Sequence, residues 1–248
     1  MITAIIQARM SSTRLPGKVL LPLGDTTILG WTVRRVREAK NISEIVVATS
    51  DRQDDDMIEK HCAELGAKIF RGNLNDVLDR YYSAAKQFAA QTVCRVTADC
   101  PLVDPEVIDR VVREYERRGC DYASTGRSAS TFPDGLDVEL FSFNALETAW
   151  KEAKLPSERE HVTPYVWNHP ERFEIVEIKN DTDLSAIRLT IDEPRDYELL
   201  KRVVADAGDL SMRGIVKYLS EHPEVAALNA PIVRDAGYLK SLAEDTKG

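Results

Sequence analysis

The feature that most constrains this chain is a regular alternation of apolar runs and helical patterns over its first 120 residues. Short apolar runs predict buried strands at Thr3–Ala8, Ile45–Ala48, Lys68–Phe70 and Thr92–Thr97. Apolar residues at helical spacing separate them, and a Pro near its start marks a further helix at Pro105–Arg117. Repeated strand–helix units predict an α/β fold with a mixed, mainly parallel sheet and helices on both faces.

Beyond Gly126 the pattern becomes less regular. A stretch rich in Ser, Thr and Gly, Thr125–Gly135, predicts a mobile loop near a site. The later elements are expected at Asp121–Ser124, Leu136–Phe143 and Arg188–Ile191 for strands, and at Ala145–Lys154 and Pro194–Ala205 for helices. No linker divides the chain, so we expect one domain over residues 1–210. Residues 211–248 then form a helical tail that packs on the core or on a partner subunit.

Charge and composition narrow the functional classes. A net charge of -8 argues against a general nucleic-acid surface, which needs a positive excess. No apolar run approaches the roughly 18 residues of a membrane helix. The N-terminus resembles a core strand and lacks the basic region of a signal peptide. The four cysteines form no CxxC pair, so we expect reduced thiols in a cytoplasmic enzyme.

A basic loop follows the first strand directly and predicts a phosphate site. It carries three cations, three hydroxyls and one Gly between Arg9 and Lys18. Its charged and hydroxyl residues are Arg9, Ser11, Ser12, Thr13, Arg14 and Lys18. Arg supplies a planar fork and Lys a point charge, which suits a triphosphate. The glycines of a P-loop are missing. The alternative, a solvated basic turn, fits less well so close to a buried strand.

Two acids are candidates for a metal site. Asp99 follows the fourth strand, and Pro101 prevents that strand from continuing. Asp192 has the same position after the last predicted strand, before a helix that begins with Pro194. Carboxyl ends of parallel strands are where ligands bind in such sheets. Mg²⁺ favours one or two carboxylates together with phosphate oxygens. Each Asp could instead be a turn or cap residue.

The sequence resembles a known family through these same segments. Ala8–Lys18, Thr97–Leu102 and Leu189–Pro194 are similar to motifs of the CMP-Kdo and CMP-sialate synthetase group. They are closer still to the spore-coat-polysaccharide cytidylyltransferase branch, and Gly135–Glu139 and Glu160–Pro164 look like further landmarks of it. The resemblance covers essentially the whole chain. It implies a Rossmann-like, GT-A-like nucleotidyltransferase fold, CTP as donor, Mg²⁺ on Asp99 and Asp192, and a homodimer.

The implied reaction is in-line attack of an acceptor oxygen on the α-phosphorus of CTP, with pyrophosphate leaving. Arg9, Arg14 and Lys18 would hold the triphosphate and stabilise the pyrophosphate. A metal ion could lower the pKa of the acceptor hydroxyl, so that no dedicated base would be needed. The remaining residues expected to contact CTP are Gln7, Ala8 and Ser12 in the loop and Arg71 and Arg80 around a turn that the family places near the nucleotide.

The acceptor is the least readable part. Asp137 and Glu139 alternate on a predicted strand and share a face, where they could bind hydroxyls or an amine. Arg127 or Arg159 could bind an acceptor carboxylate, and His161 is the one His in a motif-like context. The CMP-Kdo pattern Gly-Asp-Glu-Pro is replaced by Ala98–Pro101, which argues against Kdo itself. A sugar, another sugar acid or a non-sugar phosphate acceptor stays open.

Two other functions compete with this reading. A nucleotide-sugar-dependent glycosyltransferase has the same kind of fold, but it usually carries a DxD pair, and Cys100 and Pro101 follow Asp99 here. An inactive scaffold would have lost part of the site. Arg9, Arg14, Lys18, Asp99 and Asp192 are all present, which favours an enzyme.

Overall fold

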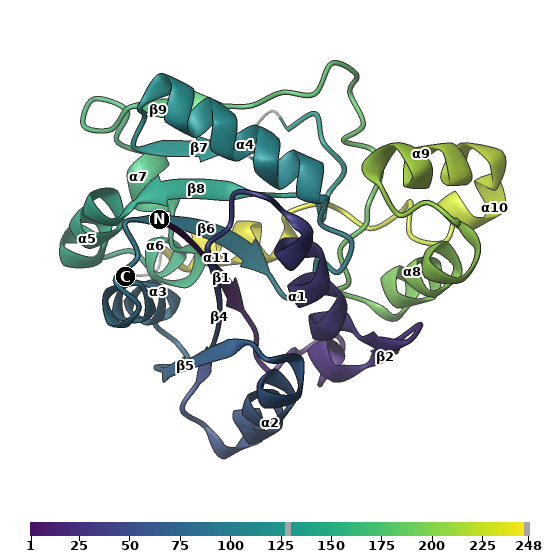
Figure 1. Ribbon diagram of the computed structural model, residues 1–248, viewed down its shortest axis with the longest axis horizontal. Coiled ribbons are helices and arrows are strands. Elements are labelled where there is room, and N and C mark those ends of the chain that lie inside the picture. The colour runs from purple at the N-terminus through teal and green to yellow at the C-terminus, as the bar shows by residue number, and fades with distance from the viewer. Residues whose placement is uncertain (127–129, 246–248) are drawn as a thin grey trace.

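The computed structural model describes residues 1–126 and 130–245, built around one seven-stranded sheet (Figure 1). Its strands, in spatial order, are β5 (Lys68–Gly72), β4 (Glu44–Ser50), β1 (Ile2–Gln7), β6 (Thr92–Thr97), β8 (Glu139–Ser142), β7 (Tyr122–Ser124) and β9 (Ile175–Glu177). The first four are parallel, β8 is antiparallel to both neighbours, and β7 and β9 are parallel. A small hairpin joins β2 (Pro22–Leu23) and β3 (Thr26–Thr27). The predicted mixed, mainly parallel sheet is confirmed.

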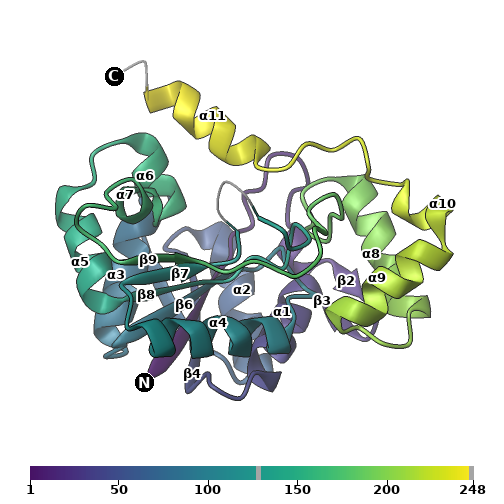
Figure 2. The same cartoon turned by 90° about the horizontal axis from the view of Figure 1, so that it is seen from above.

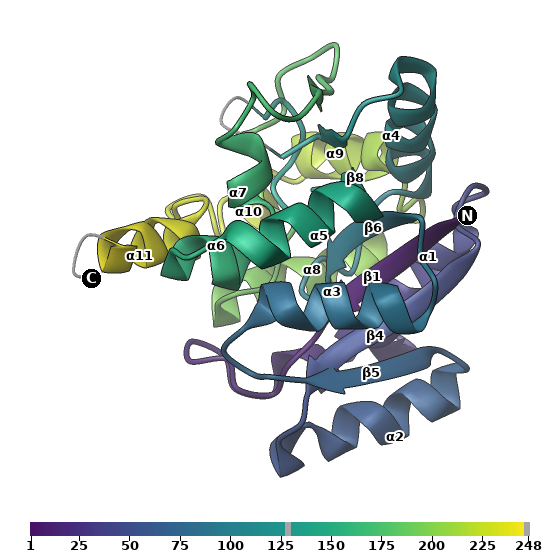
Figure 3. The same ribbon diagram turned by 90° about the vertical axis from the view of Figure 1, so that its left-hand side faces the viewer.

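Helices cover both faces of this sheet because the strands are apolar on both sides. On β1, Ile2, Ala4 and Ile6 belong to one core cluster, and Ile5 belongs to another. The first cluster packs α1 (Ile28–Glu38), α2 (Asp56–Leu65) and α4 (Pro105–Arg118). The second packs α3 (Val77–Gln87), α5 (Phe143–Glu152) and α7 (Pro164–Trp167), and Figure 3 shows α3 and α5 side by side.

The remaining helices lie at the ends of the sheet. They are two short turns, η1 (Lys18–Leu20) and η2 (Gln53–Asp55), and the helices α6 (Pro156–His161), α8 (Pro194–Asp206), α9 (Met212–Glu221), α10 (Pro223–Ala226) and α11 (Ala236–Asp245). A third apolar cluster joins α8 to α9. Within the predicted tail, α9 and α10 therefore pack on the body, whereas α11 contacts α6 and lies apart from them (Figure 2).

Two predicted strands are shorter than expected or missing. Leu136–Phe143 becomes a strand only from Glu139, because Val138 N–H donates to the Thr125 hydroxyl and not to a strand backbone. Gly135 turns the chain at φ +98°. A residue with a Cβ would not fit there, because the Cβ would lie 2.5 Å from the Leu189 carbonyl carbon. Arg188–Ile191 forms only an isolated bridge at Arg188, since Ile191 N–H donates to Asp99 O in a turn. Both segments are bound by irregular partners, which strand periodicity cannot reveal.

A candidate active site at the carboxyl ends of the strands

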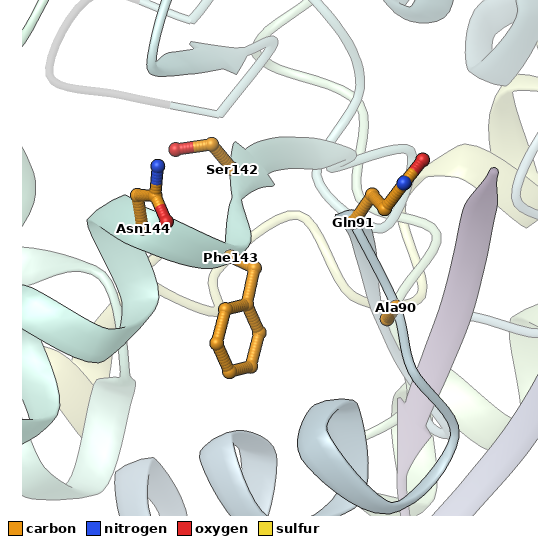
Figure 4. Close-up of a pocket in the computed structure, with 5 residues that line it drawn as sticks. All are labelled: Ala90, Gln91, Ser142, Phe143 and Asn144. Carbon is orange, nitrogen blue, oxygen red and sulfur yellow. The ribbon is translucent and has the colours of Figure 1, made fainter.

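A cleft of about 1080 Å³ opens at the carboxyl ends of β1 and β6. The basic loop after β1 lines it with Gln7, Ala8, Arg9, Ser12, Arg14 and Lys18. Asp99, Asp192 and the 134–139 segment lie along it as well, as do α6 and α11. This is the position that ligands take in sheets of this type. A second cavity of about 360 Å³, lined by Ala90, Gln91, Ser142, Phe143 and Asn144, lies at the opposite edge and has no charged lining residue (Figure 4).

The basic loop is held by its own backbone and by one buried acid. Gly17, at φ +69°, donates to the carbonyl of Met10 and closes the loop. Met10 N–H donates to the Asp55 carboxylate at 2.8 Å. Asp55 is 1% exposed and also accepts from Ser50 N–H at the end of β4. Asp55 therefore fixes the loop against the sheet, a role that its place in an acidic helix start did not reveal.

Lys18 lies at the centre of the site. Its ammonium donates to Asp99 at 2.7 Å, to Asp192 at 2.8 Å and to the carbonyl of Ile191 at 2.7 Å. These three acceptors use all three of its N–H donors. Burial alone would lower the pKa of Lys18, but the two carboxylates raise it. Burial opposes ionisation of Asp99, yet the ammonium lowers the pKa of Asp99 to about 2. Asp99 is thus held as a carboxylate.

Arg188, which sequence reasoning missed, orients Asp192 from the other side. Its guanidinium donates to Asp192 at 2.9 Å, to Asp134 at 2.5 Å and to Asp196 at 2.9 Å. Asp196 is fully buried at the start of α8 and also accepts from Asp192 N–H. The signal available in the sequence was a basic residue four positions before Asp192, which by itself is common.

Two acids predicted to bind an acceptor, Asp137 and Glu139, already have partners in the cleft. Glu139 is buried and accepts from Arg95, from the Tyr122 hydroxyl at 2.6 Å and from Thr163 at 2.8 Å. Asp137 lies before β8, so the two do not alternate on one strand as predicted, although both line the cleft. One Asp137 oxygen accepts from Arg234 at 2.6 Å and the other from Gly135 N–H.

His161 lines the cleft beside α11. Its Nε2 lies 3.0 Å from the Ser241 hydroxyl, which donates to Glu160 at 2.6 Å, so the imidazole donates to Ser241. Burial, with a smaller contribution from Arg95, lowers the pKa of His161 to about 4. The ring is therefore neutral near pH 7 and can offer a nitrogen lone pair.

Comparison with known proteins decides which family this geometry belongs to. A family model described as cytidylyltransferase matches residues 3–223. The chain belongs to the cytidylyltransferase family.

Individual relatives agree with this assignment. The chain is 36% identical to the spore coat polysaccharide biosynthesis protein SpsF of Bacillus subtilis, over 91% of this chain and 96% of that protein. A crystal structure of a cytidylyltransferase from Leptospira borgpetersenii is 37% identical, with a TM-score of 0.86 over 91% of this chain and 96% of the other. A CMP:2-keto-3-deoxy-manno-octonic acid synthetase complexed with CTP shares the fold, with a TM-score of 0.62 at 15% identity over 82% and 98% of the two chains. The resemblance to the spore-coat branch is confirmed.

Not every residue predicted for this cytidylyltransferase site lies in the cleft. Arg71 is absent from the lining, and its guanidinium pairs with Asp56 and Glu59 of α2. Arg159 is also absent, and it binds Asp76 at the start of α3 through Nε at 3.0 Å. Both cations were assigned from sequence neighbours, whereas nearer acids hold them. Arg127 lies outside the described residues.

Arg80 does lie in the cleft, from the first turns of α3. It is 1% exposed, and its Nη1 donates weakly to the Asn73 carbonyl at 3.4 Å. Its Nε has no partner among the described residues. A buried guanidinium with a free donor is suited to an anionic or carbonyl ligand, because an unpaired buried donor is costly.

The two carboxylates fit a divalent cation such as Mg²⁺. Asp99 and Asp192 converge on one point, since a single ammonium binds both. No group of three or more His, Cys, Asp or Glu side chains gathers as a metal site in the described chain. Mg²⁺ does not need such a cage, because it takes one or two carboxylates with phosphate oxygens and water. Asp99 and Asp192 are therefore the residues that would hold it.

The first prediction concerns the Lys18 ammonium. We expect Lys18→Met to lower the free energy of unfolding by about 2–3 kcal/mol, because two converging carboxylates lose their counter-charge. The side chains of Asp99 and Asp192 are about a quarter exposed, so the loss should be smaller than for a fully buried pair. Urea denaturation measures it. Mg²⁺ should raise the Tm of this variant more than that of wild type. Lys201→Met, on an exposed pair with Glu198, is the control and should change little. Wild-type stability in Lys18→Met would contradict the arrangement.

The second prediction concerns the pH dependence of stability. The pKa of His161 is about 4 in the folded protein and 6.5 in its ordinary state, so the unfolded chain binds the proton more readily between these values. Its contribution is complete above pH 6.5 and is lost as the pH falls toward 4. Between pH 7 and pH 5, wild type should lose about 1–2 kcal/mol more stability than His161→Gln in denaturant titrations. Equal losses would show that His161 is not held neutral.

Proposed function

We propose that this cytidylyltransferase transfers CMP from CTP to a hydroxyl oxygen of a sugar or sugar-acid acceptor and releases pyrophosphate. The observation that carries the proposal is the convergence of Asp99, Asp192 and the basic loop on one cleft through Lys18. The name of SpsF places that relative in polysaccharide biosynthesis, and the distant synthetase of the same fold was crystallised with CTP. Both support a CMP-sugar product used in surface glycan synthesis.

In the proposed reaction the acceptor oxygen forms a bond to the α-phosphorus and the bond from that phosphorus to the β-bridging oxygen breaks. The acceptor proton passes to solvent, and the pair of electrons leaves with pyrophosphate. Arg9 and Arg14, with side chains 45% and 38% exposed, can turn toward the β- and γ-phosphates and stabilise the leaving charge. Arg80 and the backbone of Gln7 and Ala8 are positioned for the rest of the nucleotide.

Lys18 has a different role in this proposal from the one that the sequence suggested. Its donors are committed to Asp99, Asp192 and Ile191, so it sets the spacing of the two acids and does not grip the triphosphate. A bound Mg²⁺ would neutralise phosphate charge and lower the pKa of the acceptor hydroxyl. The protein contributes a pair of acids that is already aligned before the nucleotide arrives, which lowers the cost of reorganisation.

The setting of the reaction is part of the proposal. The four cysteines are buried and free, which supports a cytoplasmic enzyme. In the described part of the chain no helix has both the length and the apolar character to cross a membrane. A homodimer remains our expectation from the family resemblance. Exposed apolar side chains such as Leu155, Val233 and Leu239 are available for such a contact.

The test of the proposed function is a pyrophosphate-release assay with each nucleoside triphosphate against neutral sugars, sugar acids and phosphorylated small molecules. We expect release with CTP and Mg²⁺ and a CMP-linked sugar product by mass spectrometry. A product from a phosphorylated non-sugar would replace the sugar acceptor. Free nucleoside diphosphate from a nucleotide sugar would instead identify a glycosyltransferase. No turnover and no CTP binding would favour an inactive scaffold.

The third prediction concerns Asp99. Asp99→Asn should lower Mg²⁺-dependent pyrophosphate release at least about 100-fold while the protein stays folded, because an amide cannot supply the anionic ligand. Circular dichroism and the rate at saturating CTP check both points. Glu193→Gln, an acid beside the site whose carboxylate lies 3.7 Å from Arg14, is a matched control and should keep most of its activity. Full activity in Asp99→Asn would remove Asp99 from the metal site.

A further inference from the structure

The segment from Asn229 to Asp245 crosses the open side of the cleft and forms one of its walls. Every residue from Asp235 to Ser241 lines the cleft, and so does Glu244. Figure 2 shows the chain running from α10 to α11, which lies beside α6. The match to the cytidylyltransferase family model ends at residue 223, so this wall lies outside the matched part. The family assignment therefore gives it no role, although it faces the site.

Polar contacts fasten this segment at three places around the cleft. Asn229 donates to Asp196 at 2.9 Å and to the Arg188 carbonyl at 3.1 Å. Arg234 donates to Asp137 at 2.6 Å and to the carbonyl of Phe132 at 3.1 Å. At the far end, Asp245 accepts from the backbone and hydroxyl of Ser157 at 2.9 and 2.6 Å. The segment thus spans from Asp196, which binds the Asp192 backbone, to α6.

Apart from the Tyr238 ring, which packs against Trp167 and His161, apolar burial contributes little to this attachment. None of the three core clusters of the described chain extends beyond Leu228. Val233 and Leu239 are 66% and 56% exposed. Segments that are held by hydrogen bonds and ion pairs at the surface open at lower free energy than core elements. This part of the chain can therefore separate from the site without unfolding the sheet.

The inner side of α11 offers groups suited to a polyhydroxylated ring. The Ser241 hydroxyl lies between Glu160 and the neutral His161, which together supply a carboxylate oxygen and an imidazole. The Tyr238 ring stands edge-on to Trp167 and His161, at 5.9 and 5.1 Å between centroids. Trp167 and Tyr238 both line the cleft. Ring faces and paired hydrogen-bonding groups of this kind recognise the apolar and hydroxylated faces of sugars.

We propose that Asn229–Asp245 is a cover over the acceptor end of the cleft, fastened by Arg234 on Asp137, and that Tyr238 and Ser241 bind the acceptor. The proposal rests on the proposed function, because it assigns the acceptor end of the same site. In the closed arrangement, water is kept from the α-phosphorus of CTP until a polyhydroxylated acceptor occupies the space beneath α11. Arg234 is a positioning residue, whereas Tyr238 and Ser241 would touch the substrate.

The fourth prediction uses water as the probe acceptor. In CTP hydrolysis the water oxygen bonds to the α-phosphorus, the α–β bridge breaks, and CMP, pyrophosphate and protons are released. Without any other acceptor, Arg234→Ala should raise this rate at least 5-fold, while the Kd for CTP with Mg²⁺ changes less than 2-fold by calorimetry. Arg234→Lys should restore slow hydrolysis. Arg118→Ala, an exposed Arg that pairs with Glu114, is the control and should match wild type.

The outcomes separate this inference from the proposed function. Wild-type protein that does not bind CTP with Mg²⁺ would overturn the proposed function itself. Wild-type binding with an unchanged hydrolysis rate in Arg234→Ala would overturn the cover alone. Weaker CTP binding in Arg234→Ala, without faster hydrolysis, would assign the segment to the nucleotide and also overturn it.

The fifth prediction addresses the acceptor contacts directly. With the acceptor found in the pyrophosphate assay, Tyr238→Ala and Ser241→Ala should each raise the KM for the acceptor at least 5-fold and leave the KM for CTP within 2-fold. Leu242→Ala, an exposed residue of the same helix, is the matched control and should change neither. A loss of affinity shared equally by both substrates, or no loss, would overturn the assignment of these residues to the acceptor.

Discussion

The arrangement of this site depends on one ammonium group. Lys18 joins the loop after β1 to Asp99 after β6 and to Asp192 before α8, segments that lie 81 and 174 residues away along the chain. Two carboxylates that converge on one point repel each other unless a positive charge lies between them. Arg188 extends the same balance outward to Asp134 and Asp196. The carboxyl ends of the strands are thus held together electrostatically where backbone pairing has ended.

The three cations of the basic loop differ in how far their side chains are exposed. Lys18 is turned inward and 9% exposed, whereas Arg9 and Arg14 remain 45% and 38% exposed. The buried cation fixes geometry. The two exposed arginines pair with Glu160 and Asp192 and, in the proposed reaction, would turn toward the triphosphate. Asp55 completes the division, because it holds Met10 N–H and so fixes the loop backbone from which both arginines project. Fixed acids with adaptable cations suit a reaction in which charge moves toward pyrophosphate.

The parallel half of the fold was predictable because β1, β4, β5 and β6 are continuous apolar runs with helices between them. The other half was less predictable, since Thr125 and Asp137 bind nearby backbone and shorten the strand that periodicity predicts.

The site shows the same contrast between residues that local sequence reveals and residues that it does not. The motif acids and the basic loop line the cleft. Asp55 and Arg234 act through Met10 and Asp137, 45 and 97 residues away, and local spacing carries no trace of these contacts. Arg188 binds Asp192 four residues on, but that spacing is too common to single it out. Arg71 pairs with Glu59, 12 residues away, and Arg159 with Asp76, 83 residues away, so the structure places both cations outside the cleft lining for which they were predicted.

Under the proposed function, Asp137 and Glu139 would connect acceptor binding to the C-terminal segment. Three donors already occupy Glu139, so it supports the cleft wall and has little capacity left for a ligand. Asp137 has one oxygen on Gly135 and the other on Arg234, and burial raises its pKa. An acceptor that uses Asp137 must therefore share it with Arg234 or replace that guanidinium. An acceptor that replaces Arg234 on Asp137 would release the segment, whereas one that shares Asp137 with Arg234 would hold it more firmly. Acceptors that differ in one hydroxyl or amine at this point would therefore differ in how well the segment covers the α-phosphorus.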